Sequence, residues 1–316
     1  MKITLPKIAI AFFLAIWIIT PWIAGIIAGQ STFGSLMAFG SYLLVVSFPV
    51  LPLRCSLLFL LRGAGIISLF AVLGFSVTFG SVSFFICAVL CAFLQAVAEL
   101  RSPYLRLPVA LGVLAYFLSV GQVPEQGITF CSTAFTAGTF WGVLPVALLL
   151  PRNDKPPMVQ PVGIHQPSEK QFTVIMMLTA LVDSILATLM TASSHPCWLP
   201  AAGLRVMKPE RSATLSRLHA RSAGTVAGAA AGGILLGFYT TPLLHASLVG
   251  MLLFVMLMVG AKRYGYWTFC LTAIALTFNL TPRAGSLSLA ADRVLLTVIA
   301  LAVAAVMLHF LPEKRS

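Results

Sequence analysis

Residues 62–98 read RGAGIISLFAVLGFSVTFGSVSFFICAVLCAFLQAVA, and this stretch decides the fold of the chain. Arg62 is its only charged residue. The stretch holds two apolar runs, 62–80 and 82–98, and each is close to the ~20 residues with which a helix crosses the hydrocarbon core of a bilayer. Neither run alternates apolar and polar residues, as the wall of a membrane β-barrel does. We therefore predict two consecutive transmembrane helices.

The same pattern fills the rest of the chain. Hydrophobic residues make up 59% of the 316 residues and charged residues only 9%, whereas a soluble domain has about 25% charged residues. We predict an all-α, polytopic transmembrane protein with about twelve spans. The predicted helices cover residues 5–28, 33–51, 62–80, 82–98, 104–120, 127–150, 171–192, 196–208, 222–239, 242–260, 264–281 and 288–311. The first run continues past Pro21, so we expect it to be an uncleaved span and not a signal peptide.

The basic residues indicate how the spans are oriented. The net charge is +12, but the lysines and arginines lie in short loops and form no continuous patch for nucleic acid. If the N-terminus is cytoplasmic and the spans alternate, only Arg283 and Arg293 of the 20 lysines and arginines fall on the outer side. This asymmetry follows the positive-inside rule. We expect a multi-pass protein of a bacterial inner membrane, in contact with the lipid bilayer and with both termini in the cytoplasm.

A single polar segment divides the chain. Residues 151–170, PRNDKPPMVQPVGIHQPSEK, are rich in proline and too irregular for a stable helix, so we predict a cytoplasmic linker. It separates an N-terminal six-helix segment, 1–150, from a C-terminal one, 171–316.

Two short matches indicate that these halves are related. They pair Arg62-Gly-Ala-Gly65 with Arg221-Ser-Ala-Gly224, and Leu149-Leu-Pro151 with Phe310-Leu-Pro312. Because each half has an even number of spans, the two repeats would be parallel, related by an axis along the membrane normal.

Residues 195–228, HPCWLPAAGLRVMKPERSATLSRLHARSAGTVAG, are the most informative for function. The apolar segment 197–207 is interrupted by Pro200 and Gly203 and is too short to cross a bilayer as one straight helix. Its counterpart, 33–51, also contains glycine and proline. Interrupted spans at matching positions of two repeats indicate a substrate path near the midplane. The alternative is an ordinary helix extended by interfacial residues.

A basic run, Lys208 to Arg221, follows this short segment. We predict a cytoplasmic interfacial helix that binds anionic lipid head groups or forms a mouth that attracts anions. The glycines that come next would form a face of small residues for close helix contact. They are not a phosphate loop, because the Walker lysine and the preceding strand are missing.

Ionisable residues within apolar spans are costly and mark pathways or paired contacts. Asp183 lies near the middle of its span and is either a proton-coupling carboxylate, whose burial allows it to load and release a proton near neutral pH, or a structural partner of a basic or hydroxyl group. Arg205 either extends to the surface or binds substrate. Arg293 either pairs with Asp292 in a structural or gating role or holds a substrate carboxylate. The candidates for anion binding are Arg205, Arg221, Arg293 and Arg62.

Other polar and aromatic residues are assigned to the surface. We expect Glu99 to pair with Arg101, and the aromatic residues around Trp267 to anchor the chain at the membrane interface. The histidines are scattered and lack the spacing of a metal site. Since no nucleophile and base are combined in a motif, the sequence predicts neither an enzyme nor a cofactor.

Several residues of the C-terminal half resemble the core signature of the fusaric-acid-resistance (FUSC) family, which is related to aromatic acid exporters. These residues are His195, Pro196, Trp198, Pro209, Thr214, Arg221, Gly224, Thr225 and Gly228. A second family motif resembles Arg293-x-x-Leu296-Thr297, with Leu296 and Ala300 in place of the usual acidic residue and glycine. The large cytoplasmic domain that many members carry between the halves is replaced here by the linker.

The resemblance implies efflux of organic anions such as aromatic carboxylic acids, beside a periplasmic adaptor protein and an outer-membrane channel. We expect a proton-driven exporter in which the substrate crosses between the halves, Asp183 carries the proton, and Arg205, Arg221 and Arg293 supply positive potential. One alternative is a passive anion channel, because plant malate channels belong to the same clan. The other is a non-transporting scaffold subunit of an envelope complex. The sequence leaves a homo-oligomer open.

Overall fold

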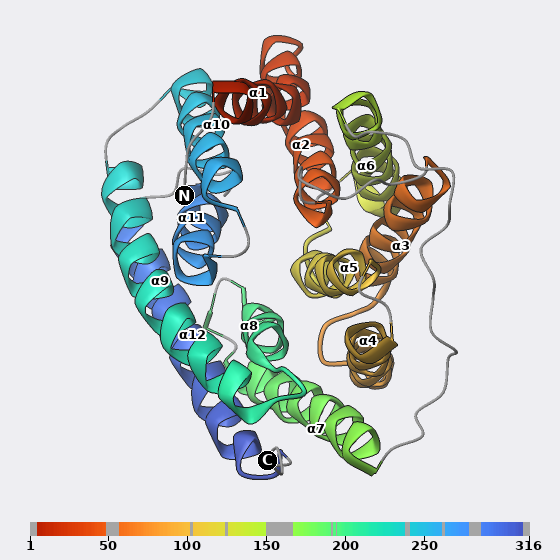
Figure 1. Cartoon of the computed structure of the whole chain (residues 1–316). Coiled ribbons are helices and arrows are strands. Elements are labelled where there is room, and N and C mark those ends of the chain that lie inside the picture. The colour runs from red at the N-terminus through yellow and green to blue at the C-terminus, as the bar shows by residue number, and fades with distance from the viewer. Residues whose placement is uncertain are drawn as a thin grey trace.

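The computed structural model describes residues 5–48, 57–101, 104–123, 126–149, 167–190, 192–193, 195–237, 241–260, 263–277 and 286–311. Over these ranges the chain forms α-helices and no strand (Figure 1). The helices are α1 (Leu5–Ile27), α2 (Ser31–Ser47), α3 (Leu57–Ser76), α4 (Val82–Arg101), α5 (Arg106–Ser119), α6 (Gly127–Leu149), α7 (Pro167–Leu189), α8 (Trp198–Val206), α9 (Arg211–Gly237), α10 (Pro242–Val259), α11 (Tyr264–Thr277) and α12 (Ser286–Leu308).

Seven of these helices are long and apolar enough to cross a membrane: α1, α3, α4, α6, α7, α10 and α12. Helices α2, α5 and α11 are also apolar but shorter. Large apolar side chains such as Leu69, Val82 and Leu148 are 67%, 75% and 77% exposed, and such surfaces on many helices are stable only against lipid. The prediction of an all-helical, multi-pass membrane protein is confirmed, whereas twelve complete crossings remain a prediction.

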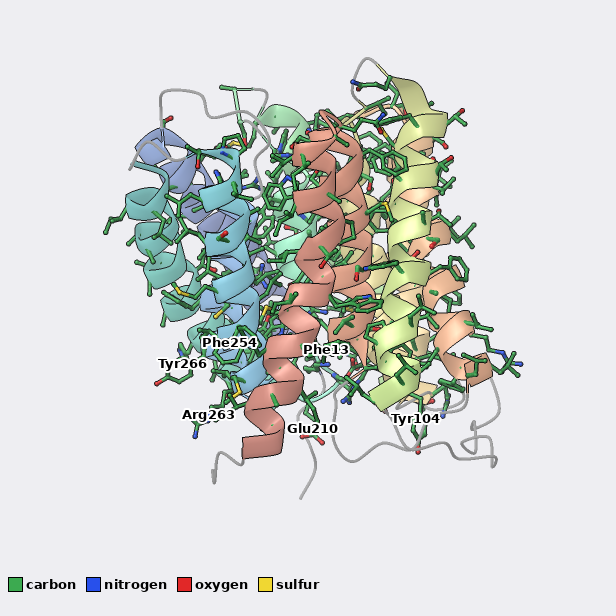
Figure 2. All side chains as sticks on the ribbon, turned by 90° about the horizontal axis from the view of Figure 1, so that it is seen from above. Phe13, Tyr104, Glu210, Phe254, Arg263 and Tyr266 are labelled. Atoms are coloured by element: carbon green, nitrogen blue, oxygen red, sulfur yellow. The ribbon has the colours of Figure 1, made fainter. Side chains whose placement is uncertain are left out.

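The helices are grouped by half (Figure 1). In the N-terminal half α2 packs on α6 and α3 on α5, and in the C-terminal half α9 packs on α11 and α12. The halves meet where α4 packs on α7, where α1 packs on α10, and where α5 touches the short α8. Figure 2 shows Tyr104, Glu210 and Arg263 at the same end of the molecule. The connections before α5, α9 and α11 therefore lie at one end.

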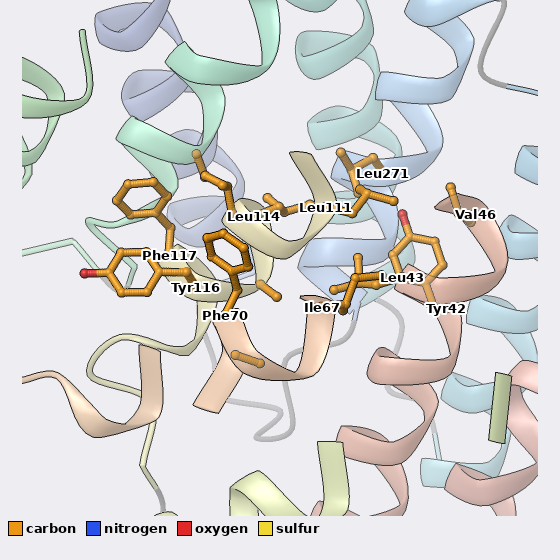
Figure 3. Packing of buried hydrophobic residues seen from close by; sticks show 14 of the residues in the cluster. Tyr42, Leu43, Val46, Ile67, Phe70, Leu111, Leu114, Tyr116, Phe117 and Leu271 are labelled. Carbon is orange, nitrogen blue, oxygen red and sulfur yellow. The ribbon is translucent and has the colours of Figure 1, made fainter. Parts of the chain in front are cut away.

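A buried core connects the two halves next to α8. Leu271 of α11 lies among buried residues of α2, α3 and α5, including Leu43 and Leu114 (Figure 3). The Tyr42 hydroxyl of α2 donates to Met256 Sδ of α10 at 3.7 Å. Residues far apart in the sequence thus form one apolar layer, which fixes the walls around the candidate site described below.

The structure differs from the sequence prediction at α9, which is one continuous helix of 27 residues. The basic run was predicted to be a separate interfacial helix, but no glycine or proline interrupts the chain between Arg211 and Arg221. Thr214, Leu218, Arg221 and Thr225 are all buried and repeat with the spacing of one helix face. The polar run therefore continues as the first turns of α9.

Two further predictions are corrected at the ends of α4 and α7. Helix α7 begins at Pro167, so residues 167–170 are helical and not part of the linker, as the preference of proline for the first helical position allows. The predicted linker residues 151–166 lie outside the described ranges. Arg101 pairs with Glu169 of α7, whereas Glu99 pairs with Lys208. The predicted pair of Glu99 with Arg101 is therefore wrong.

Candidate functional site

The chain segment before α8 is held against the start of α12. The Ser193 hydroxyl donates to Asp292 Oδ2 at 2.7 Å, and the backbone N–H of His195 donates to Ser193 Oγ at 3.3 Å. The backbone N–H of Trp198 then donates to the carbonyl oxygen of His195 at 3.0 Å. These bonds place Trp198 at the first turn of α8, facing α12.

Trp198 brings together residues of both family motifs. Its side chain is buried, and its indole Nε1–H donates to Thr297 Oγ1 of α12 at 3.1 Å. The Arg293 guanidinium carbon lies 4.7 Å from the centre of the Trp198 ring system, and that of Arg221 lies 6.0 Å from it. A cation held over an indole face is attracted by the ring quadrupole. Residues of α8, α9 and α12 therefore form one cationic and aromatic cluster.

The guanidinium of Arg293 is buried and only partly satisfied. Its side chain is 3% exposed, and its Nε and Nη1 atoms have no hydrogen-bond partner among the described residues. The charge of the neighbouring Asp292 acts on Arg293, and the Asp292 carboxylate accepts a hydrogen bond from Ser193. Buried donors without a partner are costly, and two N–H groups of Arg293 are therefore available to a ligand.

Arg293 and Trp198 line a cavity of about 290 Å³ between the halves of the chain. Most of its walls are apolar or aromatic, which is typical of small-molecule sites. The lining residues are Ser35, Leu36, Phe39, Tyr42, Leu114, Leu118, Gln122, His195, Trp198, Leu271, Ile274, Ala275 and Arg293. They come from α2, α5, α8, α11 and α12 and from two connecting segments. A hollow of about 340 Å³ between α1, α2 and α6 is lined by no charged residue, so the site of interest is the cavity at Arg293.

His195 adds an uncharged polar group to this cavity. Burial and the positive charge of Arg293 lower the pKa of His195 to about 3. The imidazole is therefore neutral at physiological pH, with one nitrogen as donor and the other as acceptor. Arg293 is the charged side chain that lines the cavity.

Other residues of the first family motif shape the connection between α8 and α9. The Thr214 hydroxyl accepts from the backbone N–H of Lys208 at 2.9 Å and donates to the Lys208 carbonyl at 3.1 Å. Gly224 and Gly228 lie so close to the carbonyl oxygens of Gly265 and Phe269 that a Cβ atom would not fit. The prediction of a small-residue contact face is confirmed, because these glycines let α9 approach α11.

Arg205 does not extend to the surface. Its side chain is 8% exposed, and its guanidinium carbon lies 4.9 Å from the centre of the Trp267 ring system. Trp267 is itself 2% exposed, whereas Tyr266 is 64% exposed. The predicted interfacial anchor is therefore wrong for Trp267, which lies beneath a buried arginine, and stays a prediction for Tyr266.

Asp183 of α7 is fully buried and packs against Gly203 of α8. Neither of its carboxylate oxygens has a hydrogen-bond partner among the described residues. The alternative in which Asp183 forms a structural pair with a basic or hydroxyl group is therefore not observed. The carboxyl group lies at an apolar contact between α7 and α8, and Thr179 lies next to the same glycine.

The cavity does not include all of the predicted residues. Arg62 on α3 has an exposed side chain and does not line the cavity. The described residues hold no cluster of three potential metal ligands. Sequence reasoning missed Tyr42, Phe39 and Gln122, which the N-terminal half contributes to the cavity; in a chain this apolar, no sequence signal separates a cavity wall from a lipid-facing residue.

Comparison with known proteins supports the resemblance seen in the sequence. Residues 175–307 match the family model described as fusaric acid resistance protein-like, and this range includes Trp198, Arg221 and Arg293. No curated protein and no solved structure matches the chain. The match thus extends from within α7 into α12, a region that carries the buried arginines and is similar to fusaric acid resistance proteins.

Proposed function

We propose that this protein is an inner-membrane transporter that exports small organic anions, with an aromatic carboxylic acid as the model substrate. The observation that carries the proposal is the buried and only partly satisfied guanidinium of Arg293. It is a buried cation whose Nε and Nη1 have no hydrogen-bond partner among the described residues, and most of the other walls of its cavity are apolar or aromatic. A carboxylate accepts paired hydrogen bonds from a guanidinium, and an apolar or aromatic body fits the remaining walls.

The arrangement of helices supports a path between two related halves. The contacts of α2 with α6, α3 with α5 and α3 with α6 have counterparts in α8 with α12, α9 with α11 and α9 with α12. In this correspondence each helix of the N-terminal half matches the helix six places later. The contact of α4 with α7 therefore corresponds to the contact of α10 with α1, so the contacts between the halves are related as well. This correspondence is what two parallel repeats about an axis along the membrane normal would give. The cavity is lined by α2 and α8, the short helices at matching positions.

Asp183 is the proton carrier in this proposal. Among the described residues its carboxyl group has no hydrogen-bond partner to hold the charged form, and an isolated charge in apolar surroundings is costly. Because it packs on α8, a change in its protonation would act on the helix that carries Trp198. Export of the organic anion would then be coupled to the proton gradient, with both termini of the chain in the cytoplasm.

The proposal is tested with purified protein in liposomes, using radiolabelled benzoate and an imposed pH gradient. Arg293→Gln keeps a polar side chain but removes its charge, and we expect the initial flux to fall at least about tenfold, the value of one charge-assisted hydrogen bond. Arg62→Gln is the matched control and leaves the flux unchanged, because Arg62 is exposed outside the cavity. Full flux in a folded Arg293→Gln variant would overturn the proposal.

The coupling mechanism is tested in the same liposomes. Asp183→Asn is expected to abolish the dependence of benzoate flux on the pH gradient. If the wild-type flux ignores the gradient and bilayer recordings give unitary currents, the protein is a passive anion channel and not an exporter.

A further inference from the structure

A second group of arginines meets at the C-terminal end of α8. The carbonyl oxygen of Arg205 accepts hydrogen bonds from Arg217 Nη1 and from the Tyr264 hydroxyl, both at 3.4 Å. Arg221 Nη1 donates to the same Tyr264 oxygen at 3.4 Å. Arg205 of α8 and Arg217 and Arg221 of α9 therefore meet at Tyr264 of α11.

The aromatic rings of α11 hold two of these arginines in place. The Arg217 guanidinium carbon lies 4.8 Å from the centre of the Tyr264 ring, and Arg205 lies over Trp267 as described above. The two rings are nearly parallel, with an angle of 15° and a distance of 6.3 Å between their centres. Contacts of this kind order the guanidinium groups but offset only a small part of the cost of burying a charge.

The positive charge of this group has no acidic partner in the described part of the chain. The ion pairs of Arg101 with Glu169 and of Arg106 and Lys208 with Glu99 do not include any of the three arginines. The three guanidinium charges also act on one another, because Arg217 and Arg221 both repel Arg205. Burying like charges without a counter-ion is strongly unfavourable. A bound anion would compensate the charge of these arginines.

Capping of α8 explains only part of this arrangement. The last carbonyl groups of a helix need donors, and Arg217 and Tyr264 supply them to Arg205. However, Arg205 Nε and Arg221 Nε are buried and have no hydrogen-bond partner in the described residues. These side chains are 8% and 1% exposed, so water at the surface does not satisfy them.

We propose that Arg205, Arg217, Arg221 and Tyr264 form a second anion site, separate from the cavity at Arg293, which binds a small inorganic anion such as chloride. The size of the ion follows from the packing. Gly224, three residues beyond Arg221, lies against the Gly265 carbonyl with no room for a Cβ atom, so α9 and α11 are in direct contact next to the site and an organic body does not fit between them there. Arg217 is partly exposed and connects the site to the aqueous phase. The site goes beyond the proposed function and does not rest on it.

The test is thermal unfolding of the purified protein in a neutral detergent at constant ionic strength, with chloride replaced stepwise by gluconate. We expect a saturable rise of the Tm with chloride and with bromide, because an ion bound only by the folded state stabilises it. Arg205→Gln and Arg221→Gln are expected to remove this rise. Arg293→Gln and Arg62→Gln are expected to keep it.

Arg217→Gln is the milder variant, since its side chain is only partly buried, and it covers the case in which Arg205→Gln or Arg221→Gln does not fold. We expect its apparent Kd for chloride to rise about tenfold, the loss of one hydrogen bond to a charged group. Equal Tm values in chloride and gluconate would overturn the proposal. So would loss of the chloride effect in Arg293→Gln but not in Arg217→Gln, because the ion would then belong to the cavity.

A lipid source of the anion is separated by one further measurement. Phosphatidylglycerol added to the micelles in gluconate leaves the Tm unchanged if the site takes a free ion. A rise with this lipid and none with chloride would overturn the proposal in favour of a lipid head group. Benzoate flux is measured separately, so failure of the chloride site leaves the test of transport at Arg293 unaffected.

Discussion

The carboxyl group of Asp183 packs against the backbone of Gly203, where a glycine alone leaves it room. The contact joins α7 to the short α8, which also carries Trp198 and Arg205. The position of the buried carboxyl group is therefore set by the same helix that presents two of the buried aromatic and cationic groups.

Gly203→Ala is expected to displace Asp183, because the new Cβ atom would overlap Asp183 Oδ2. Overpacking of this kind costs about 1–3 kcal/mol, so the Tm in detergent falls and the coupling of flux to the pH gradient is lost. Gly65→Ala is the matched control, since a Cβ atom at Gly65 meets nothing within 4 Å. Equal Tm values for the two variants would show that the contact does not constrain Asp183.

The hydrogen bond between Trp198 and Thr297 should behave as one interaction. Trp198→Phe and Thr297→Val each remove it, and we expect each to lower the free energy of unfolding by about 1–3 kcal/mol, because the remaining buried partner is left unsatisfied. The double variant is expected to cost less than the sum of the two single variants, with a coupling of about 1 kcal/mol. Chemical unfolding of the four proteins measures this cycle, and additive losses would contradict the bond.

The stability of the protein should fall in acid through His195. Burial and Arg293 lower its pKa in the folded chain to about 3 from 6.5, so the unfolded chain binds a proton between these values and the folded chain does not. Stability from this group is present above pH 6.5 and is lost as the pH falls towards 3. The Tm of wild type should therefore drop more between pH 7 and pH 5 than that of His195→Gln. Identical pH dependence would contradict the burial of a neutral imidazole.

The sequence could predict the helices because continuous apolar runs have one stable form in lipid. It could not place the start of α9, since Arg211 to Arg221 are polar and no apolar run marks them. In the structure α9 packs on α11 and α12, and Thr214 and Arg221 of this segment are buried. Packing between distant helices carries no signal in a local pattern.

The candidate site was predicted only in part for a related reason. Trp198 and Arg293 stand in recognisable motifs, and they meet across α8 and α12. The residues that the N-terminal half supplies, such as Tyr42 and Phe39, belong to a helix in which every residue is apolar or small. Whether such a residue faces lipid, core or cavity is set by the fold alone.

The ion pair between Glu99 and Lys208 links the two halves of the chain, because Glu99 lies in the last turn of α4 and Lys208 follows α8. Their atoms Oε1 and Nζ lie 2.5 Å apart, and the two side chains are 9% and 13% exposed. Breaking a pair that is largely buried leaves one charge uncompensated and costs several kcal/mol. We expect Glu99→Gln to lower the free energy of unfolding by about 3 kcal/mol. Replacing both residues, as Glu99→Gln with Lys208→Met, should recover part of this loss.

Arg106→Gln is the control for this prediction. The Arg106 Nη1 atom lies 3.6 Å from Glu99 Oε1, and the Arg106 side chain is half-exposed. Such pairs contribute about 0–1 kcal/mol.

The same pair gives a test by pH. Burial lowers the pKa of Lys208 to about 8 from 10.5, and the charge of Glu99 opposes this shift. Between these two values the unfolded chain holds a proton that the folded chain has released, so the contribution of Lys208 to stability rises with pH across this window. Without Glu99 the pKa of Lys208 should fall further, and the rise should begin at a lower pH in Glu99→Gln. Unfolding titrations from pH 7 to pH 10.5 measure the slope, which Lys208→Met should flatten. An unchanged slope in Lys208→Met would show that Lys208 is not buried between the halves.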